Sequence, residues 1–446
     1  MKGVGVLEKV SVISLGCAKN LTDAEVMLAK LQKGGYEITY NEREAEIMIV
    51  NTCAFIDSAK QESIDTIIDL ADLKKDAKLK LLIVAGCMGE RFSKEVLEEL
   101  PEVDGVCGTG DFDDIVAVIE KVKKERGIYK KGSEYACLDT TDRILATPPY
   151  TAYLKIAEGC SNHCTYCVIP KIRGKYRSRD KESIVEEAKL LASKGVKEIV
   201  IIAQDTSCYG KDLNPKSSLT EIIREISAIE DIKWVRVHYL YPEGVTDDLL
   251  EEFATNEKLV KYFDIPLQHI ADSVLKKMAR RTSAEQIKAL IEKIRSKVKD
   301  AVIRTSLIVG FPGETDEDFY ELYDFLKEYK LDRVGVFSYS QEESTPAAAY
   351  ENQIEEDVKF ERKSKLEELL MEITELKNQE KIGKIADVLV EGKDKVLKMY
   401  YGRTYADSID VDPKVFFKSE DEYEEGQMVK VKFVDYIDCD MIGELI

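Results

Sequence analysis

Short apolar runs alternate with amphipathic, helix-like segments along most of the chain. Near its start, KVSVISLGC (9–17), EIMIVNTC (46–53) and KLLIVAGC (80–87) each have the pattern of a buried strand, and VDGVCGTGD (103–111) is a weaker example. Segments with helical periodicity separate them. Strands that alternate with helices form parallel sheets, so we predict an N-terminal open parallel α/β sheet.

The same alternation continues over the middle of the chain, where six β/α repeats predict a partial (β/α)6 barrel rather than a full eight-fold one. In such barrels the chemistry collects at the C-terminal ends of the strands. The predicted strands are 151–159, 196–205, 233–241, 262–268, 301–311 and 332–340.

The remaining segments have other patterns. Residues 126–150 show neither helical nor strand periodicity, and two prolines lie near their end. This pattern predicts a linker. The pattern of residues 355–384 predicts a long charged helix. From about residue 381 onward, strand-like segments alternate with turns that contain glycine and aspartate, which predicts a small antiparallel β-barrel. The predicted division is 1–125, 126–150, 151–380 and 381–446.

Composition limits the location and the partners. The 446 residues are 44% apolar and 34% charged, with no signal-peptide pattern and no apolar run of about 18 residues. We therefore expect a cytoplasmic protein with no membrane segment, in which clustered cysteines bind metal or do chemistry rather than form disulfides. The net charge of -20 argues against nucleic acid as the primary partner and favours a basic one.

Three of the ten cysteines lie close together just after the first barrel strand, as C-x3-C-x2-C: Cys160, Cys164 and Cys167. One loop with this spacing can hold three corners of a [4Fe–4S] cluster, which leaves the fourth iron open to a substrate or cofactor. Tyr166 is then placed to cover the cluster or to pack on a bound ring. The alternative is a zinc site completed by His163 or by a remote cysteine.

A second set of three cysteines follows successive predicted strands: Cys17, Cys53 and Cys87. Because parallel strands end at one edge of a sheet, these thiols should converge there. They could hold a second cluster that also has one open iron. The alternative is that each is a small buried apolar side chain.

The cysteine loop resembles the signature of the radical S-adenosylmethionine (SAM) family, and RTSLIVGFPGET (304–315) resembles the strand-and-glycine motif that packs on the adenosine of SAM. The resemblance implies that reductive cleavage of SAM gives a 5′-deoxyadenosyl radical. Glycines allow close approach to a ligand, although GFPGET is also an ordinary strand-to-helix turn. For the expected SAM contacts at strand ends, the alternative is that these polar residues are simply solvated. The expected SAM-binding residues are Tyr166, Gln204, Asp205, Gln268, Arg304, Gly310 and Gly313.

The whole chain resembles the methylthiotransferase family, which combines an N-terminal domain with an auxiliary cluster, a radical SAM barrel and a C-terminal TRAM barrel. The resemblance implies two [4Fe–4S] clusters, SAM, an external electron donor and insertion of a methylthio group into a C–H bond. A two-cluster electron carrier is the alternative from another class, but a carrier needs no SAM-binding motif.

Family members differ in acceptor: some modify adenosine in tRNA, and others the β-carbon of an aspartate in the small-subunit ribosomal protein S-twelve. The segments SLGCAKNLTDAE, IPKIRGKYRSR, PLQHIADSVLKKMARR and YYGRTYADSIDVD resemble the second branch. Residues 381–446 hold ten basic and fifteen acidic residues, which suits a basic ribosomal protein better than tRNA.

Against this choice stands the basic stretch 171–179, in which Lys171, Arg173, Lys175, Arg177 and Arg179 alternate with other residues. As an extended segment it would present one basic face. That face could contact RNA phosphates, bind the carboxylate of SAM or be solvated, so contact with nucleic acid stays open as a secondary possibility.

Overall fold

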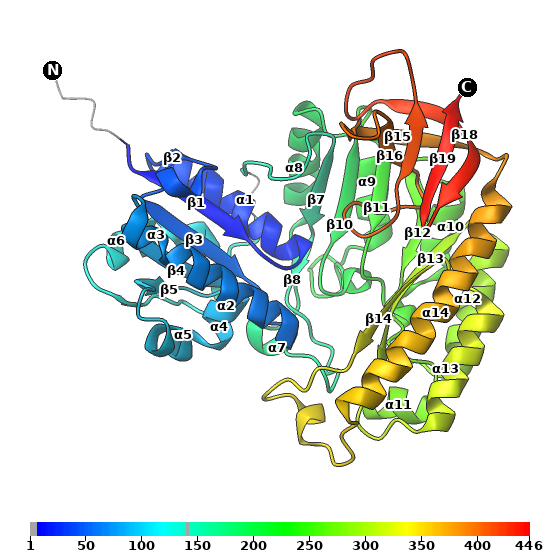
Figure 1. Cartoon of the computed structure of the whole chain (residues 1–446), viewed down its shortest axis with the longest axis horizontal. Coiled ribbons are helices and arrows are strands. Elements are labelled where there is room, and N and C mark those ends of the chain that lie inside the picture. Colours follow the sequence, from blue (N-terminus) through cyan, green and yellow to red (C-terminus); the bar gives the residue numbers. More distant parts are fainter. Residues whose placement is uncertain (1–6, 140–141) are drawn as a thin grey trace.

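The structure is a computed structural model that describes residues 7–139 and 142–446. Its N-terminal part is a parallel sheet with the strand order β2-β1-β3-β4-β5-β6 (Figure 1). The strands are β1 (Lys9–Ser14), β2 (Glu37–Ile38), β3 (Ile47–Thr52), β4 (Leu81–Gly86), β5 (Gly105–Val106) and β6 (Gly127–Ile128). The helices are α1 (Ala18–Lys33), α2 (Asp57–Ala71), α3 (Leu73–Asp76), α4 (Cys87–Arg91), α5 (Ser93–Glu99) and α6 (Ile115–Val122).

Helices cover both faces of this sheet, which is why its central strands are apolar throughout. Along β3, Ile47 and Ile49 pack with α1 and α6, while Met48 and Val50 pack with α2 and α5 on the other face. The predicted open parallel α/β sheet is therefore confirmed. One detail is different: β6 lies within the stretch that we expected to lack strands, because a pairing of two residues leaves no periodic signal.

The central part is an open six-stranded parallel sheet in sequential order, as the partial (β/α)6 barrel predicts. Each strand pairs with the next one along the chain. The strands are β7 (Thr151–Lys155), β10 (Glu198–Ile202), β11 (Trp234–Val237), β12 (Leu259–Asp264), β13 (Val302–Val309) and β14 (Arg333–Ser338). The helices are α7 (Ile169–Ile172), α8 (Lys181–Ser193), α9 (Leu219–Ser227), α10 (Asp247–Thr255), α11 (Asp272–Lys277), α12 (Ala284–Lys297) and α13 (Asp316–Tyr329).

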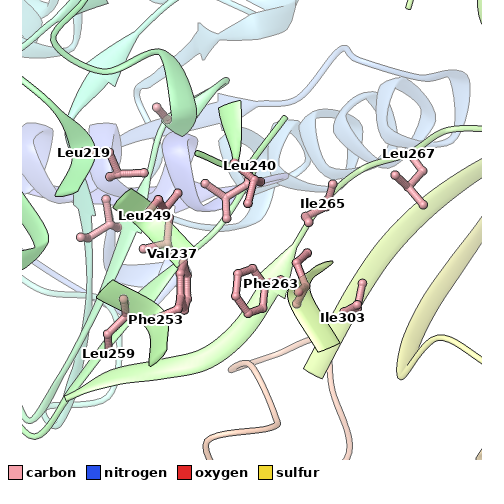
Figure 2. Packing of buried hydrophobic residues seen from close by; sticks show 14 of the residues in the cluster. Leu219, Val237, Leu240, Leu249, Phe253, Leu259, Phe263, Ile265, Leu267 and Ile303 are labelled. Carbon is pink, nitrogen blue, oxygen red and sulfur yellow. The ribbon is translucent and has the colours of Figure 1, made fainter. Parts of the chain in front are cut away.

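The largest apolar core of the chain lies between these strands and the helices outside them (Figure 2). Phe253 of α10 and Phe263 of β12 pack with their ring centroids 4.1 Å apart. Side chains alternate along the strands: Ile199 and Ile201 of β10 face this core, whereas Val200 and Ile202 belong to a smaller apolar cluster. Side chains of consecutive residues along the strand therefore point to opposite faces of the sheet and pack in different apolar clusters.

The C-terminal part is reached through the long helix α14 (Glu356–Lys381) and is a closed five-stranded barrel. The predicted small antiparallel β-barrel is confirmed: four of its pairings are antiparallel, and one, between β17 and β19, is parallel. The reason is topological, because strand direction cannot alternate at every step around a ring of five. The strands are β15 (Ile385–Lys393), β16 (Tyr400–Arg403), β17 (Val415–Lys418), β18 (Met428–Ile437) and β19 (Asp440–Leu445).

A buried ion-pair network joins the C-terminal barrel to the central sheet. Glu198 of β10 accepts hydrogen bonds from Arg236 Nε (2.9 Å) and Arg403 Nη2 (2.7 Å). All three residues are at most 1% exposed. Burial raises the pKa of a carboxyl group, but the two guanidinium groups outweigh burial and lower the pKa of Glu198 to about 2.

This network predicts how stability depends on pH. A carboxylate with a lowered pKa stabilises the fold above its unfolded pKa of 4.5, and this contribution is lost as the pH falls toward 2. Glu198→Gln should therefore cost about 3 kcal/mol at pH 7, and the difference from the wild type should shrink with acid. Urea unfolding at several pH values measures it, with the exposed Glu225→Gln as control. A difference that does not change with pH would contradict the assignment.

Candidate active site

The cysteine loop 160–167 is closed at its base by a short antiparallel pair, β8 (Ala157–Glu158) with β9 (Arg177–Ser178). The Cys160 N–H donates to the Gly174 carbonyl at 3.0 Å. Gly159 has φ +77°, and a Cβ there would lie 2.2 Å from the Lys175 carbonyl oxygen, so the loop requires glycine at this position. This base directs the three cysteines into one compact loop.

Neighbouring barrel loops hold the cysteine loop in place. The Thr165 N–H donates to the Met278 carbonyl at 3.1 Å, and its hydroxyl donates to the Lys277 carbonyl at 2.8 Å. On the other side, Asn162 Nδ2 donates to Asp205 Oδ2 at 2.8 Å. The end of α11 and the loop after β10 therefore fix the positions of the three thiols.

These thiols lie in a largely buried environment with one nearby cation. Burial raises the pKa of Cys160 to about 11 and that of Cys167 to about 12. Arg280 Nη1 lies 3.9 Å from Cys164 Sγ, and its guanidinium lies 4.4 Å from the centre of the Tyr241 ring. Metal ligation requires thiolates, so binding of a cluster here must release protons, and Arg280 favours the resulting negative charge. No sequence pattern predicts this role of Arg280, because the contact joins positions 116 residues apart.

Two predicted strand-end residues, Gln204 and Asp205, do lie beside the cysteine loop. Gln204 Nε2 donates to Glu158 Oε1 at 2.7 Å, while Gln204 Oε1 is buried without a hydrogen-bond partner among the described residues. Asp205 is 2% exposed and also accepts from Ser207 Oγ at 2.6 Å. Gln204 thus has one free acceptor, whereas Asp205 is engaged in fixing the loop.

Of the other two predicted strand-end residues, Gln268 is bonded through its backbone and Arg304 through its side chain. Gln268 follows β12 with φ 73°, and its backbone bonds to β13 through Ser306 (2.9 Å) and Ile308 (2.7 Å). Such backbone strain in a non-glycine residue is typical of functional sites. Arg304 lies near the N-terminal end of β13, where its Nη1 donates to Asp264 Oδ1 at 2.8 Å.

The GFPGET turn lies next to the cysteine loop. Gly310 and Gly313 have φ +71° and +75°, which favour glycine. Lys277 Nζ donates to the Gly313 carbonyl at 2.7 Å, and the neighbouring carbonyl of the same lysine binds the cysteine loop. Phe311 and Tyr166 share one apolar cluster. The turn also caps α13 through Thr315, as the simpler interpretation expected, while its contact with SAM stays a prediction.

The second cysteine set follows three adjacent parallel strands, β1, β3 and β4. Cys17 is exposed, whereas Cys53 and Cys87 are buried. Burial raises the pKa of Cys53 and brings that of Cys87 to about 12, with smaller contributions from the other cysteines of the set. The surrounding protein would also raise the pKa of Cys17, but the charges of Lys19 and Arg173 outweigh this effect and lower it.

A buried charged network connects the two cysteine sets. Arg173 Nη1 donates to Asp23 Oδ2 (2.6 Å) and Glu158 Oε2 (3.2 Å), and its Nη2 contacts Asn20 and lies 3.8 Å from Cys87 Sγ. Lys155 bonds the same two carboxylates. Burial alone would raise the pKa of Glu158, but Lys155 and Arg173 lower it strongly. One arginine therefore contacts α1, Cys87 and the strand that leads into the cysteine loop.

This arrangement corrects one expectation about the basic stretch 171–179. It does not form one extended face, because α7 and Gly174 (φ +75°) bend it. Arg173 and Arg179 are buried in ion pairs, the latter with Glu187 at 2.6 Å, and Arg177 donates to carbonyl groups of residues 133–136. The interior of the protein, not a phosphate backbone, satisfies these guanidinium groups.

The residues fit iron–sulfur clusters in their donor type. Each set supplies three thiols with a cationic group near one sulfur, and His163 beside Cys164 is exposed. Over residues 7–139 and 142–446, no three Cys, His, Asp or Glu side chains lie closely enough to hold one metal ion. A tetrahedral zinc would bring its sulfurs within about 4 Å of one another, given Zn–S bonds of about 2.3 Å. A cluster of four irons spans a wider set of thiols.

Comparisons with known proteins agree with this organisation. Family profiles match residues 154–326 (radical SAM superfamily), 9–108 (uncharacterized protein family UPF0004) and 382–446 (TRAM domain). Among solved structures, the radical SAM methyltransferase TsrM from Kitasatospora setae, with cobalamin and a [4Fe-4S] cluster bound, has a TM-score of 0.56 at 15% identity and covers 77% of each chain. This likeness concerns the fold. The chain thus has the architecture of a radical SAM enzyme with a further N-terminal cysteine site.

Similar proteins of known name define the class of radical SAM enzyme more closely. Two proteins named ribosomal protein uS12 methylthiotransferase RimO are similar over nearly the whole length: one from Acetivibrio thermocellus (48% identical, 98% of each chain) and one from Caldanaerobacter subterraneus (50% identical, 98% of this chain and 100% of the other). The chain belongs to the RimO family of radical SAM methylthiotransferases. Membership implies SAM and two [4Fe–4S] clusters as cofactors. Within the described residues, no helix is both long and apolar enough to span a membrane.

Proposed function

We propose that this chain transfers a methylthio group to ribosomal protein uS12, the S-twelve protein considered above, at the β-carbon of an aspartate. The names of the relatives support the protein substrate. The observation that carries the proposal is the arrangement of two three-cysteine sets connected through Arg173. When bound, the two clusters and SAM supply a carbon-centred radical and a sulfur atom for transfer.

We assign the first cluster to the cysteine loop (Cys160, Cys164, Cys167) and the auxiliary cluster to Cys17, Cys53 and Cys87. The free Gln204 Oε1 suits the ammonium group of SAM, because a buried acceptor without a donor is costly. Tyr166 and Phe311 offer an apolar surface beside the cysteines. The remaining proposed SAM contacts are Asp205, Gln268, Arg304, Gly310 and Gly313, of which Arg304 has the least support, since Asp264 already engages it.

The charge of the surface supports a basic protein as acceptor. The C-terminal barrel has more acidic than basic residues, and the basic stretch that favoured RNA is largely taken up by internal contacts. We further propose a cytoplasmic location, an external electron donor, and a division of the chain at residues 125, 150 and 380.

The acceptor assay tests the proposal. Anaerobic, cluster-replete and reduced protein is incubated with SAM and either purified uS12 or unmodified tRNA. We expect mass spectrometry to detect a methylthio group on one aspartate of uS12 and none on tRNA. Modification of tRNA alone would overturn the choice of acceptor. Absence of 5′-deoxyadenosine from the fully loaded protein would overturn the enzymatic function itself.

A further inference from the structure

Lys19, in the first turn of α1, has an unusual environment for a lysine. The residue is 8% exposed, and Lys19 Nζ lies 3.4 Å from the centre of the Tyr239 ring. No carboxylate of the described chain lies within 4.0 Å of this ammonium group. The nearest acidic residue on its helix, Asp23, is already bound by Lys155 and Arg173. Among the described residues, the ammonium group therefore has an aromatic ring and the Cys17 thiol near it but no carboxylate partner.

The position of Lys19 places this charge between the two parts of the active site. Cys17 is the N-cap of α1, and Tyr239 follows β11 at the C-terminal end of the barrel strands. Ala18 and Leu21 on the same turn belong to an apolar cluster with barrel residues Val200 and Ile202. The ammonium group therefore lies beside the auxiliary cysteines and faces the barrel.

Two further features make this position suited to an anion. The 16-residue helix α1 has no acidic residue in its first turn and no side-chain cap, so its N-terminal N–H groups and its dipole add positive potential beside Lys19. Tyr239 has φ 61°, and its N–H donates to Asp264 Oδ2 at 3.1 Å. This contact fixes the ring that supports the lysine.

We propose that Lys19 binds the side-chain carboxylate of the substrate aspartate. This inference rests on the proposed function, in which the reacting carbon is the β-carbon of an aspartate. That carbon is bonded directly to the carboxylate, so holding the carboxylate fixes the reacting C–H bond next to the auxiliary site. The same contact gives specificity, because a neutral side chain leaves the ammonium group unpaired.

The test compares uS12 with a uS12 variant in which the modified aspartate, located by mass spectrometry, is replaced by asparagine. Lys19→Met retains an unbranched apolar side chain of similar length over Tyr239, and Lys19→Arg retains the charge. Lys33→Met on the last turn of α1, where the side chain is 69% exposed, is the matched control. Dissociation constants and kcat/KM are measured for both substrates, together with iron content and SAM cleavage without substrate.

Wild type and Lys33→Met should bind uS12 about 10- to 100-fold more tightly than its asparagine variant, as expected for a hydrogen bond between charged groups. Compared at equal iron content, Lys19→Met should lose this preference, and Lys19→Arg should keep most of it. An unchanged preference in Lys19→Met would overturn the inference. So would a loss of iron, which would mean that Lys19 supports the auxiliary cluster. If wild-type protein does not modify uS12, the proposed function fails, and the assigned ligand fails with it.

Discussion

Cys160→Ala should abolish SAM cleavage, whereas Cys17→Ala should retain some cleavage and lose methylthio transfer. The two cysteines belong to different sets, one on the loop after β8 and the other at the N-terminus of α1. Loss of one thiolate from a set of three should leave that set unable to hold its cluster, while the other set keeps its ligands. The two substitutions should therefore distinguish SAM cleavage from methylthio transfer.

The measurements are 5′-deoxyadenosine, methylthio-uS12 and bound iron, on anaerobically reconstituted protein. Cys439→Ala, at an exposed position in the C-terminal barrel, is the control and should behave as wild type. Retained transfer by Cys17→Ala would contradict the assignment of the auxiliary site. Retained SAM cleavage by Cys160→Ala would contradict that of the first cluster.

Arg173→Met should destabilise the protein by about 3–5 kcal/mol, because removal of one partner from a buried ion network leaves the others uncompensated. Asp23 and Glu158 are both within hydrogen-bond distance of Arg173, and each is at most 3% exposed. Lys155 alone cannot replace a guanidinium group that also reaches Asn20. Urea unfolding measures the change.

Lys171→Met is the matched control, since Lys171 lies on α7, which ends just before Arg173. Its side chain is exposed and, among the described residues, bonds only the Ser344 carbonyl. Arg173→Lys should fall between the two, because one ammonium group cannot replace the fork of donors. An unfolding curve of Arg173→Met that matches that of the wild type would show that the network contributes no net stability.

The parts of the fold with a strong local period could be predicted from the sequence. The strand-plus-cysteine repeats place Cys17, Cys53 and Cys87 at one sheet edge, and a parallel sheet requires this whatever the tertiary details are. The six β/α repeats are equally regular. The two-residue strand β6 and the parallel β17–β19 pair depend on pairing across the fold, which leaves no periodic trace.

The same distinction applies to the active site. The proposed cysteine ligands lie close together in sequence or repeat with the strands, so their spacing is visible. Arg280, Lys19 and Arg173 acquire their roles only when distant segments meet, and each looks like an ordinary surface cation in the sequence. Cations are usually exposed to solvent, so only the contacts that these three make in the structure indicate their roles.

The small apolar cluster that contains Ala18, Leu21, Val200, Ile202 and Ile409 draws on all three parts of the chain. Ile409 follows both cysteine sets along the sequence. A nascent chain on the ribosome therefore cannot complete this cluster until it has been translated through Ile409. The packing of α1 against the barrel strands is thus completed only after both cysteine sets have been translated.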